Sequence, residues 1–323
     1  MLAQRLRRRH RHLRKRMRKA GVSCYRLYER DISDQPAIVD WYDGDAVVWT
    51  FPRTRDETPT AARAWEESVV AAVAEGLALS AERIHAKHRG RQSGAEQYLR
   101  LDHSGHERIV AEQGLRFAVN LVDFLDTGLF LDHRLTRARV RSEAAGRDML
   151  NLFGYTGAFA CYAAAGGAAS TTGVDMNTGY CDWARHNLAL NAADTQRHRV
   201  VRADCLAWLD RPRPACFDLI VCDPPTFSNS KKMRCAFSVE RDHPWLLRRC
   251  AELLRPGGLL YFSTNKRGFQ LAADALESFA AAQELTPDSI PVDFRNRRIH
   301  RCWRCVRSAT ACAAPRQPRG SSR

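Results

Sequence analysis

The chain of 323 residues is long enough for one large domain and a smaller one, each able to bury a core without disulfides or metals. No apolar run approaches the length that spans a bilayer, and no apolar segment follows the basic start to make a secretory signal, so we expect a cytoplasmic protein. The eleven cysteines are scattered through apolar segments, which favours reduced, buried thiols over a disulfide framework.

The formal net charge of +15 is concentrated at the two ends of the chain. Residues 1–20 carry ten Lys or Arg and no acid, and residues 295–323 carry nine Arg and no acid. Polycationic ends suit a polyanion, because each phosphate neutralised by Lys or Arg releases a condensed counterion. Nucleic acid is therefore the first partner to consider. The alternatives are a solvated tail or an Arg-rich transit peptide, and the lack of Ser in residues 1–20 weighs against the transit peptide.

The first 122 residues predict a basic helix followed by a small module. Leu2, Leu6, Leu13 and Met17 fall on one side of a helix over residues 1–20, which ends at Gly21. Residues 21–122 predict a small α+β module that we interpret as an RNA-binding accessory domain. Its predicted elements are strands over 24–28, 37–42, 47–51, 84–87 and 117–121, and a helix over 59–79.

From Asp148 onward, short β-rich runs alternate with helical patterns. We predict strands over 148–153, 171–175, 199–203, 217–223, 259–264, 290–294 and 302–307, and helices over 158–165, 180–190, 206–210, 243–254 and 271–281. This alternation predicts an α/β, Rossmann-like domain over residues 123–308, with a mostly parallel seven-stranded sheet covered by helices on both faces. Residues 309–323, rich in Ala, Pro, Arg, Gly and Ser, are expected to be a disordered basic tail.

Polar residues and glycines follow the first three strands of this domain. The turn Phe153–Gly157 lets backbone approach a ligand closely, and the amides that open the next helix favour a carboxylate or phosphate. Asp175 ends the second strand, where its carboxylate could accept both hydroxyls of an adenosine ribose. Asp204 follows the third strand and could accept from the exocyclic amine of adenine. Any one of these acids would more often be a helix cap, but several in succession favour a nucleoside-bearing ligand.

The fourth strand ends in Asp223-Pro224-Pro225-Thr226-Phe227. Two prolines remove two backbone donors and fix φ, so the loop carbonyls and Phe227 are held rigidly at the edge of the cleft. Such a loop can grip a flat base by stacking on the aromatic ring and hydrogen bonding beside it. A simple strand-ending turn is the alternative. We predict Asp223, Pro224, Pro225 and Phe227 as the catalytic residues.

Five segments carry a resemblance to a known family. They are GLFLDHR over residues 128–134, NLFGYTG over 151–157, DCLAWL over 204–209, DPPTFSNSK over 223–231 and NKRGF over 265–269. Together they resemble the C-terminal, guanine-N7 methyltransferase half of the bifunctional bacterial 23S ribosomal RNA methyltransferase K/L. The resemblance covers nearly the whole chain, from the basic helix to Trp303.

The resemblance implies a class I methyltransferase fold with S-adenosylmethionine as cofactor. It places the target base near Pro224 to Phe227 and Asp132 near the methionine end of the cofactor. The predicted cofactor-binding residues are Asp132, Asn151, Phe153, Gly154, Tyr155, Thr156, Gly157, Asp175, Met176, Asp204, Cys205 and Asp223. The predicted contacts to 23S ribosomal RNA, free or in an assembling large subunit, are Arg7, Arg8, Arg14, Lys15, Arg18, Lys231, Lys232, Lys266 and Arg267.

The chain departs from the family in two respects. Gly154 stands where a small hydroxyl residue is expected, which leaves the loop more flexible. The half of the bifunctional enzyme that methylates guanine N2 is also lacking. The chain therefore either works alone or is a separated piece with reduced affinity for RNA, and a separate chain could supply the other half.

The residues around the fourth and fifth strands bear on the reaction. Methylation at C5 of a pyrimidine needs a cysteine nucleophile, which related ribosomal RNA enzymes place soon after a Phe-Ser pair of the fifth strand. Here Phe262-Ser263 is followed by Thr264-Asn265, so this reaction is disfavoured. Exocyclic-amine methylation commonly uses Pro-Pro followed directly by an aromatic, whereas Thr226 intervenes here. Guanine N7 remains, whose lone pair needs no base. The alternatives left open are an exocyclic amine, guanine N2 or adenine N6, and a non-catalytic RNA-binding or ribosome-assembly factor.

Two further patterns are assigned no chemistry. Cys302 and Cys305 form a lone C-x-x-C without the second pair that a zinc knuckle needs. The histidines show no metal-ligand spacing, so we predict no metal site, and His133 is the only one expected near the active site. Dinucleotide-dependent oxidoreduction is disfavoured because no Gly-x-Gly-x-x-Gly turn follows the first strand.

Overall fold

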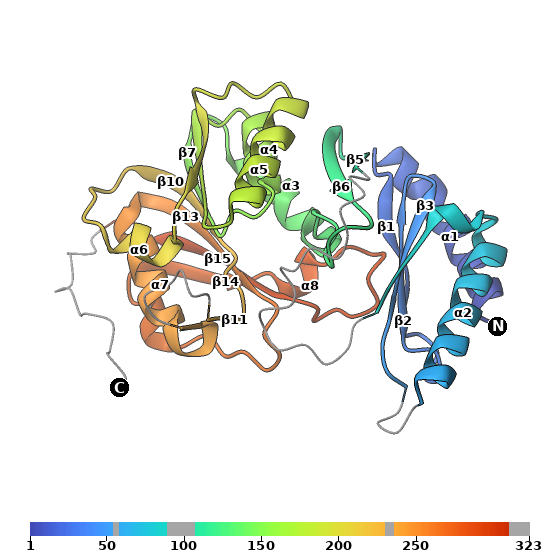
Figure 1. The fold of residues 1–323 in the computed structure, drawn as a ribbon. Helices are drawn as coiled ribbons and strands as arrows, with labels where there is room; N and C mark the ends of the chain where they lie inside the picture. The colour runs from blue at the N-terminus through green and yellow to red at the C-terminus, as the bar shows by residue number, and fades with distance from the viewer. Residues whose placement is uncertain (54–57, 89–106, 230–235, 310–323) are drawn as a thin grey trace. The chain divides into compact units, whose positions relative to one another are not determined.

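The computed structural model describes residues 1–53, 58–88, 107–229 and 236–309 (Figure 1). These residues fold into two compact units. The N-terminal unit is Met1–Leu131 with Pro291–Asn296, and the C-terminal unit runs from Asp132 to Ile290 and onward from Arg297. Lys231, Lys232 and all but the first residue of the predicted tail lie outside the described residues. Within the described part of the chain, no helix is long and apolar enough to cross a bilayer.

The N-terminal unit packs two helices on a four-stranded sheet of order β1-β2-β3-β4. The strands are β1 (Cys24–Glu29), β2 (Ala37–Tyr42), β3 (Asp45–Thr50) and β4 (Ile84–His88), with a separate hairpin of β5 (Glu107–Glu112) and β6 (Leu115–Asn120). Helix α1 (Leu2–Lys19) buries the predicted apolar stripe, and α2 (Pro59–Leu77) buries Trp65, Val69 and Val73. A short 3-10 turn, Ala81–Arg83, leads into β4. The two helices are therefore held by apolar faces spaced at helical periodicity.

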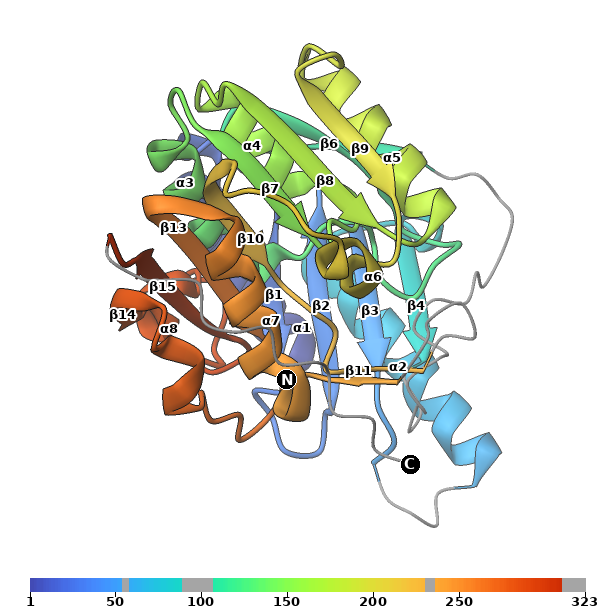
Figure 2. The ribbon, with the colours of Figure 1, turned by 90° about the vertical axis from the view of Figure 1, so that its left-hand side faces the viewer.

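The C-terminal unit is built on one seven-stranded sheet of order β14-β15-β13-β10-β7-β8-β9 (Figures 1 and 2). The strands are β7 (Asp148–Leu152), β8 (Ser170–Asp175), β9 (His198–Arg202), β10 (Phe217–Cys222), β13 (Leu254–Thr264), β14 (Phe279–Glu284) and β15 (Arg301–Arg307). β15 pairs antiparallel with β13 and β14, and the other pairs are parallel. The predicted mostly parallel seven-stranded sheet is confirmed.

Helices cover both faces of this sheet. The helices are α3 (Arg134–Glu143), α4 (Ala158–Ala165), α5 (Thr178–Leu190), α6 (Cys205–Asp210), α7 (Val239–Leu253) and α8 (Thr286–Ser289), with 3-10 turns at Leu131–His133 and Ala273–Leu276. Met149 and Leu219 pack with α3 and α4 on one face, whereas Leu150 and Ile220 pack with α6 and α7 on the other. Successive residues of buried strands thus feed two separate cores, which is why these strands read as continuous apolar runs.

Two predicted elements near the end of the chain are wrong. The helix predicted over 271–281 is a short 3-10 turn followed by β14, because Ala281 to Gln283 pair with β15 and tertiary pairing overrides the helix propensity of alanine. The strand predicted over 290–294 is a turn, in which the backbone N–H of Phe294 donates to the carbonyl of Pro291 at 3.1 Å. Ile290 and Phe294 are nevertheless buried, so apolarity alone misled the prediction.

Candidate active site

The ends of four parallel strands bring the predicted site residues to one edge of the sheet. Leu152 of β7 pairs with Val174 of β8 and with Cys222 of β10, and Val174 pairs with Val201 of β9. The strands therefore end level with one another. Asn151, Asp175, Asp204 and Asp223 stand at or just beyond these ends, and the structure brings them together at the carboxyl edge, where ligands bind in open α/β sheets.

The loop between β7 and α4 is held in an unusual backbone conformation. Phe153 and Tyr155 have φ of 54° and 49°, a region that costs a non-glycine residue free energy. Three hydrogen bonds hold it there: Phe153 N–H donates to Cys205 Sγ at 3.2 Å, Gly154 N–H to the Val174 carbonyl at 3.0 Å, and Tyr155 N–H to Asp175 Oδ2 at 2.9 Å. The loop and the acid of β8 are thus one assembly.

The polar groups around this loop fit an adenosine-bearing cofactor. The Nδ2 of Asn151 is buried and has no hydrogen-bond partner among the described residues, so a donor is left for a ligand. Asp175 accepts from two backbone N–H groups, and its burial raises the pKa of its carboxyl. Asp204 caps α6 through one oxygen, accepting from Leu206 N–H at 2.9 Å. The carboxylate oxygens of Asp175 and Asp204 keep free lone pairs, which could accept hydrogen bonds from ribose hydroxyls and from the amine of adenine.

The remaining predicted cofactor residues support the loop or line it. The Sγ of Cys205 donates to the Val174 carbonyl at 3.2 Å, and burial raises the pKa of this thiol, so the side chain holds the loop from behind. The carbonyl of Thr156 accepts from Asn187 Nδ2 at 2.8 Å. Gly157 opens α4 with φ of 76°, and Met176 is half-buried beside Asp175.

The Asp-Pro-Pro loop is anchored to the end of β13. Ser263 Oγ donates to Asp223 Oδ1 at 2.6 Å, and Thr226 Oγ1 donates to Asn265 Oδ1 at 2.7 Å. Phe227 is 45% exposed, which leaves its ring available to a partner. It lies in the short strand β11 (Phe227–Ser228), which pairs with β12 (Phe237–Ser238). Sequence reasoning did not anticipate Ser263, because the prediction used Phe262-Ser263 only to locate the following positions, where a cysteine nucleophile would stand.

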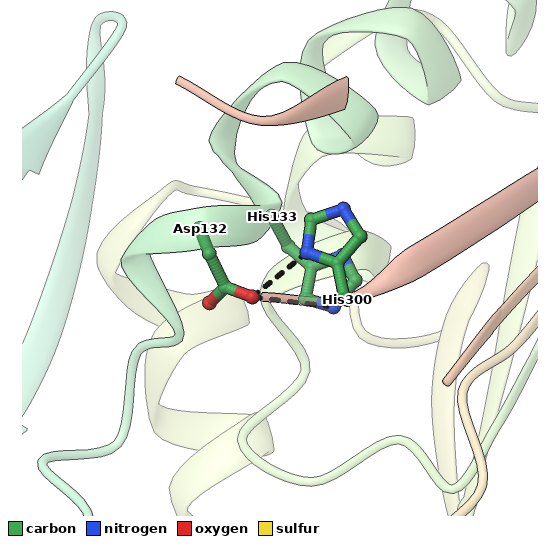
Figure 3. Close-up of side chains that lie close together, drawn as sticks. All are labelled: Asp132, His133 and His300. Atoms are coloured by element: carbon green, nitrogen blue, oxygen red, sulfur yellow. Dashed lines mark hydrogen bonds and ion pairs between the residues drawn. The ribbon is translucent and has the colours of Figure 1, made fainter. Parts of the chain in front are cut away.

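Asp132, His133 and His300 form a cluster of side chains (Figure 3). Through His133 this cluster lies beside Asp223. The Nδ1 of His300 is 2.8 Å from Asp132 Oδ2, and its Nε2 is 2.9 Å from Ser289 Oγ. The Nε2 of His133 lies 3.6 Å from Asp223 Oδ2 and 3.9 Å from Asp132 Oδ2. The cluster therefore links the acid of the Asp-Pro-Pro loop to the acid of the GLFLDHR segment. His300 was not predicted.

The protonation of His133 follows from its surroundings. Burial lowers the pKa of His133, and the neighbouring His300 lowers it further. The carboxylates of Asp223 and Asp132 act in the opposite direction but offset this shift only in part. The ring is then neutral at neutral pH. Its Nδ1 is buried without a partner among the described residues, so a proton there would be a donor with no acceptor. The proton belongs on Nε2, which faces both carboxylates.

The same three residues offer atoms within reach of one metal ion, but the rings are badly oriented for it. The potential ligand atoms lie within 4.8 Å of one another. The imidazoles of His133 and His300 are stacked, with centroids 4.1 Å apart and an interplanar angle of 12°. A metal ion lies in the plane of each imidazole that binds it, and two nearly parallel, stacked planes cannot share such a point. We therefore interpret the cluster as a hydrogen-bonding and charge network.

The predicted RNA contacts fall in both units. Arg7, Arg8, Arg14, Lys15 and Arg18 are exposed on α1. In the C-terminal unit, Lys266 Nζ lies 3.0 Å from Glu240 Oε1, whereas Arg267 is exposed. The rest of the predicted set, Lys231 and Lys232, is not described.

The comparisons with known proteins agree with this geometry. The sequence profile described as "S-adenosylmethionine-dependent methyltransferase" matches residues 25–284. The chain belongs to the S-adenosylmethionine-dependent methyltransferase family. S-adenosylmethionine is thus its cofactor. The chain is also 46% identical over 312 residues to the ribosomal RNA large subunit methyltransferase K/L of Methylococcus capsulatus, covering 95% of this chain but 42% of that protein.

Two further relatives refine the comparison. The ribosomal RNA large subunit methyltransferase K of Neisseria meningitidis serogroup B is 44% identical over 294 residues, which cover 90% of this chain and 83% of that protein. A solved structure of a candidate S-adenosylmethionine-dependent methyltransferase from Streptococcus mutans superposes with a TM-score of 0.72 at 22% identity, covering 94% of this chain and 80% of that one. The structural likeness confirms the fold of this methyltransferase.

Substitutions at two loop glycines should have opposite effects on stability. A Cβ at Gly154 would meet its nearest neighbour, Asn151 Nδ2, at 3.4 Å, an ordinary contact, and the φ of Gly154 is not positive. Gly154→Ser should therefore stabilise the fold by about 0.4 to 1 kcal/mol by restricting the unfolded chain. Gly157→Ser should destabilise it, because φ is +76° and the Cβ would lie 2.9 Å from that of Ala184. Urea unfolding without cofactor measures both, and a stabilised Gly157→Ser would contradict the loop geometry.

Substitutions of His133 test whether its N–H supports the two carboxylates. His133→Leu should slow methyl transfer by about tenfold to a hundredfold, as expected when a reacting group is slightly misplaced, and should leave cofactor affinity nearly unchanged. His133→Gln keeps an N–H near the position of Nε2 and should retain most of the rate. Because the pKa of His133 is lowered from 6.5, more than half of its rings stay neutral at pH 6.5, and the wild-type rate should fall mainly in more acid solution. The fall should be smaller in the Gln variant, in which only the carboxylates titrate. Wild-type turnover in the Leu variant would refute this role.

Proposed function

We propose that this methyltransferase transfers a methyl group to N7 of a guanine in the RNA of the large ribosomal subunit. Support for the substrate class comes from the two curated relatives, whose names identify them as ribosomal RNA large subunit methyltransferases. The observation that carries the proposal is the rigid loop at the carboxyl edge, where Asp223 is fixed by Ser263 and the exposed ring of Phe227 stands four residues on. This loop is suited to grip a flat base at the edge where the cofactor residues converge.

The chain's own residues then account for binding and alignment. Asn151, Asp175 and Asp204 would hold the adenosine portion of S-adenosylmethionine, which supplies an electrophilic methyl group on a sulfonium. Asp223 accepts hydrogen bonds from the base and orients it, and Phe227 stacks on the base. Guanine N7 has a nucleophilic lone pair and loses no proton, so no general base is required. Catalysis consists mainly of positioning the base in a pocket that excludes water.

The charge that develops on the base favours the same assignment. Methylation at N7 leaves a positive charge on guanine, and the carboxylate of Asp223 would stabilise it. Asp223 keeps its orientation because Ser263 holds one oxygen and the Nε2 of His133 faces the other. Methylation of an exocyclic amine, at guanine N2 or adenine N6, is the second candidate, because a carboxylate at this position could also accept the proton that an amine must lose.

The proposed substrate also suggests partners and location. Arg7, Arg8, Arg14, Lys15 and Arg18 on α1, Lys231, Lys232, Lys266 and Arg267 are proposed to contact ribosomal RNA. The chain spans 42% of the length of its K/L relative. A separate chain that supplies a guanine-N2 methyltransferase is the proposed protein partner. A cytoplasmic location follows from a ribosomal substrate.

Asp223→Ala should separate chemistry from cofactor binding. The substitution removes the group that orients the base, whereas Asn151, Asp175 and Asp204 remain. We expect transfer to fall by about a hundredfold or more, with the dissociation constant for S-adenosylmethionine changed by less than about threefold. Single-turnover transfer and isothermal calorimetry measure the two quantities. Normal turnover in this variant would refute the assignment, and an equal loss in both would make Asp223 a cofactor residue.

The modified atom can be identified directly. The protein is incubated with S-adenosylmethionine labelled in the methyl group and with large-subunit RNA that lacks its natural modifications. Nucleoside mass spectrometry of the product should show 7-methylguanosine. Labelled N2-methylguanosine or N6-methyladenosine would support the second candidate. No label in RNA, with cofactor binding intact, would favour a non-catalytic RNA-binding factor.

A further inference from the structure

A groove in the N-terminal unit has one strongly cationic wall. It has a volume of about 500 Å³ and runs between α1 and the C-terminal end of α2. The residues that line it are Arg7, His10, Arg11, Arg14, Lys15 and Arg18 from α1, and Glu75, Gly76, Leu77 and Ala78 from α2 and its C-cap. We call this feature the α1–α2 groove.

The spacing of the arginines places them along one side of α1. Arg7, Arg11, Arg14 and Arg18 follow one another at intervals of three or four residues, so they share a face next to the buried stripe of α1. With a rise of about 1.5 Å per residue, the row is about 16 Å long. The helices meet closely at Gly76, where an added Cβ would lie 2.6 Å from the carbonyl oxygen of Ala3. The row of cations is thus held against the end of α2.

Most of these cations are not engaged by other described residues. The side chains of Arg11, Arg14, Lys15 and Arg18 have no hydrogen bond or ion pair with any described residue. Arg7 contacts Glu75, with distances of 3.3 Å to the carbonyl oxygen and 3.4 Å to Oε1. Both of these side chains are more than half exposed, so the ion pair contributes little and can exchange for another anion. The wall offers a linear array of charges to a polyanion.

The opposite wall has the reverse character. The last turn of α2 contains no basic residue, carries Glu75, and ends in main-chain carbonyls that form the negative end of the helix dipole. Phosphates are repelled there, whereas the amino groups of bases could donate to these carbonyls. A double helix would present phosphates to both walls. One strand, with its phosphates on α1 and its bases toward α2, matches both.

We propose that the α1–α2 groove binds a single-stranded segment of RNA, with the phosphate backbone on Arg7, Arg11, Arg14, Lys15 and Arg18. The proposal rests on the proposed function, in which ribosomal RNA is the substrate. It adds the place where the chain binds the RNA and the single-stranded form of the bound segment. Arg8, which is exposed on α1 but does not line the groove, lies outside this site.

Two double substitutions distinguish the groove from the net charge of α1. Arg11→Gln/Arg14→Gln removes two groove cations, and Arg16→Gln/Lys19→Gln removes two exposed cations of the same helix that do not line the groove. The full chain, without cofactor, is titrated into a fluorescein-labelled single-stranded RNA of about 12 nucleotides. The fluorescence anisotropy of the RNA is measured at several salt concentrations. The groove variant should bind about tenfold more weakly, and its salt slope should fall by about 1.4.

The control variant should bind within about threefold of the wild type. Equal losses in both variants, with equal melting temperatures, would show that only the charge of α1 matters and would overturn the proposal. A duplex of the same sequence should compete at least tenfold less well than the single strand. Equal competition would refute the single-strand assignment.

Glu75 supplies a test in the opposite direction. Glu75→Gln removes the acid from the second wall and releases Arg7, so the single strand should bind about threefold to tenfold more tightly. Glu67→Gln is the matched control, since Glu67 pairs with Arg63 on α2 and does not line the groove. Weaker binding by Glu75→Gln would contradict the proposal. None of these binding measurements involves methyl transfer. If the protein methylated no guanine but the groove variant still bound RNA more weakly, the proposed function would be disproved and the groove proposal would stand.

Discussion

The parallel pairing of β7 with β8 and β10 is the constraint on which the site depends. Leu152 is level with Val174 and Cys222, so Asn151, Asp175 and Asp223 arrive at one edge of the sheet. A shift of one residue in any pair would exchange the two faces of that strand. The two cores resist such a shift, because Met149 and Leu150 belong to different ones. Packing in the two cores therefore fixes the positions of the polar groups at the carboxyl edge of the sheet.

A concentration of acids at one edge needs donors that hold each carboxylate without using all of its oxygen lone pairs. Asp175 has two backbone N–H donors, Asp223 has the hydroxyl of Ser263, and Asp132 has the imidazole of His300. Burial raises the pKa of Asp175, and these backbone donors act against that shift. The donors come from the β7–α4 loop, from the turn after β8, from β13 and from the residue before β15. The acids are thereby fixed from behind and keep acceptor capacity on the ligand side.

Much of this edge could be predicted from the sequence, because short-range patterns determine it. An apolar β-rich run followed by an acid marks a strand end, and parallel strands end at the same edge, so Asp175, Asp204 and Asp223 could be grouped. His300 could not. It precedes β15, and only the antiparallel pairing of Arg301 with Thr264 brings the start of that strand to the carboxyl edge. The other edge of β15 pairs with β14, and this explains the misassigned segment at Ala281 to Gln283, whose alanines favour a helix until β15 supplies a partner.

The two units differ in how their charges are placed. In the proposed function this difference assigns affinity for RNA to the N-terminal unit and methyl transfer to the C-terminal unit. The cations of α1 are exposed and largely unpaired, so they keep a counterion atmosphere that a phosphate backbone can displace, with a gain that declines as salt rises. The acids of the carboxyl edge are partly buried and hydrogen-bonded to neighbouring groups, so salt screens them much less. In the proposed function the first set contacts a phosphate backbone and the second contacts a base, so neither set can replace the other. Raised salt should therefore weaken the capture of RNA while leaving the alignment of a captured base intact.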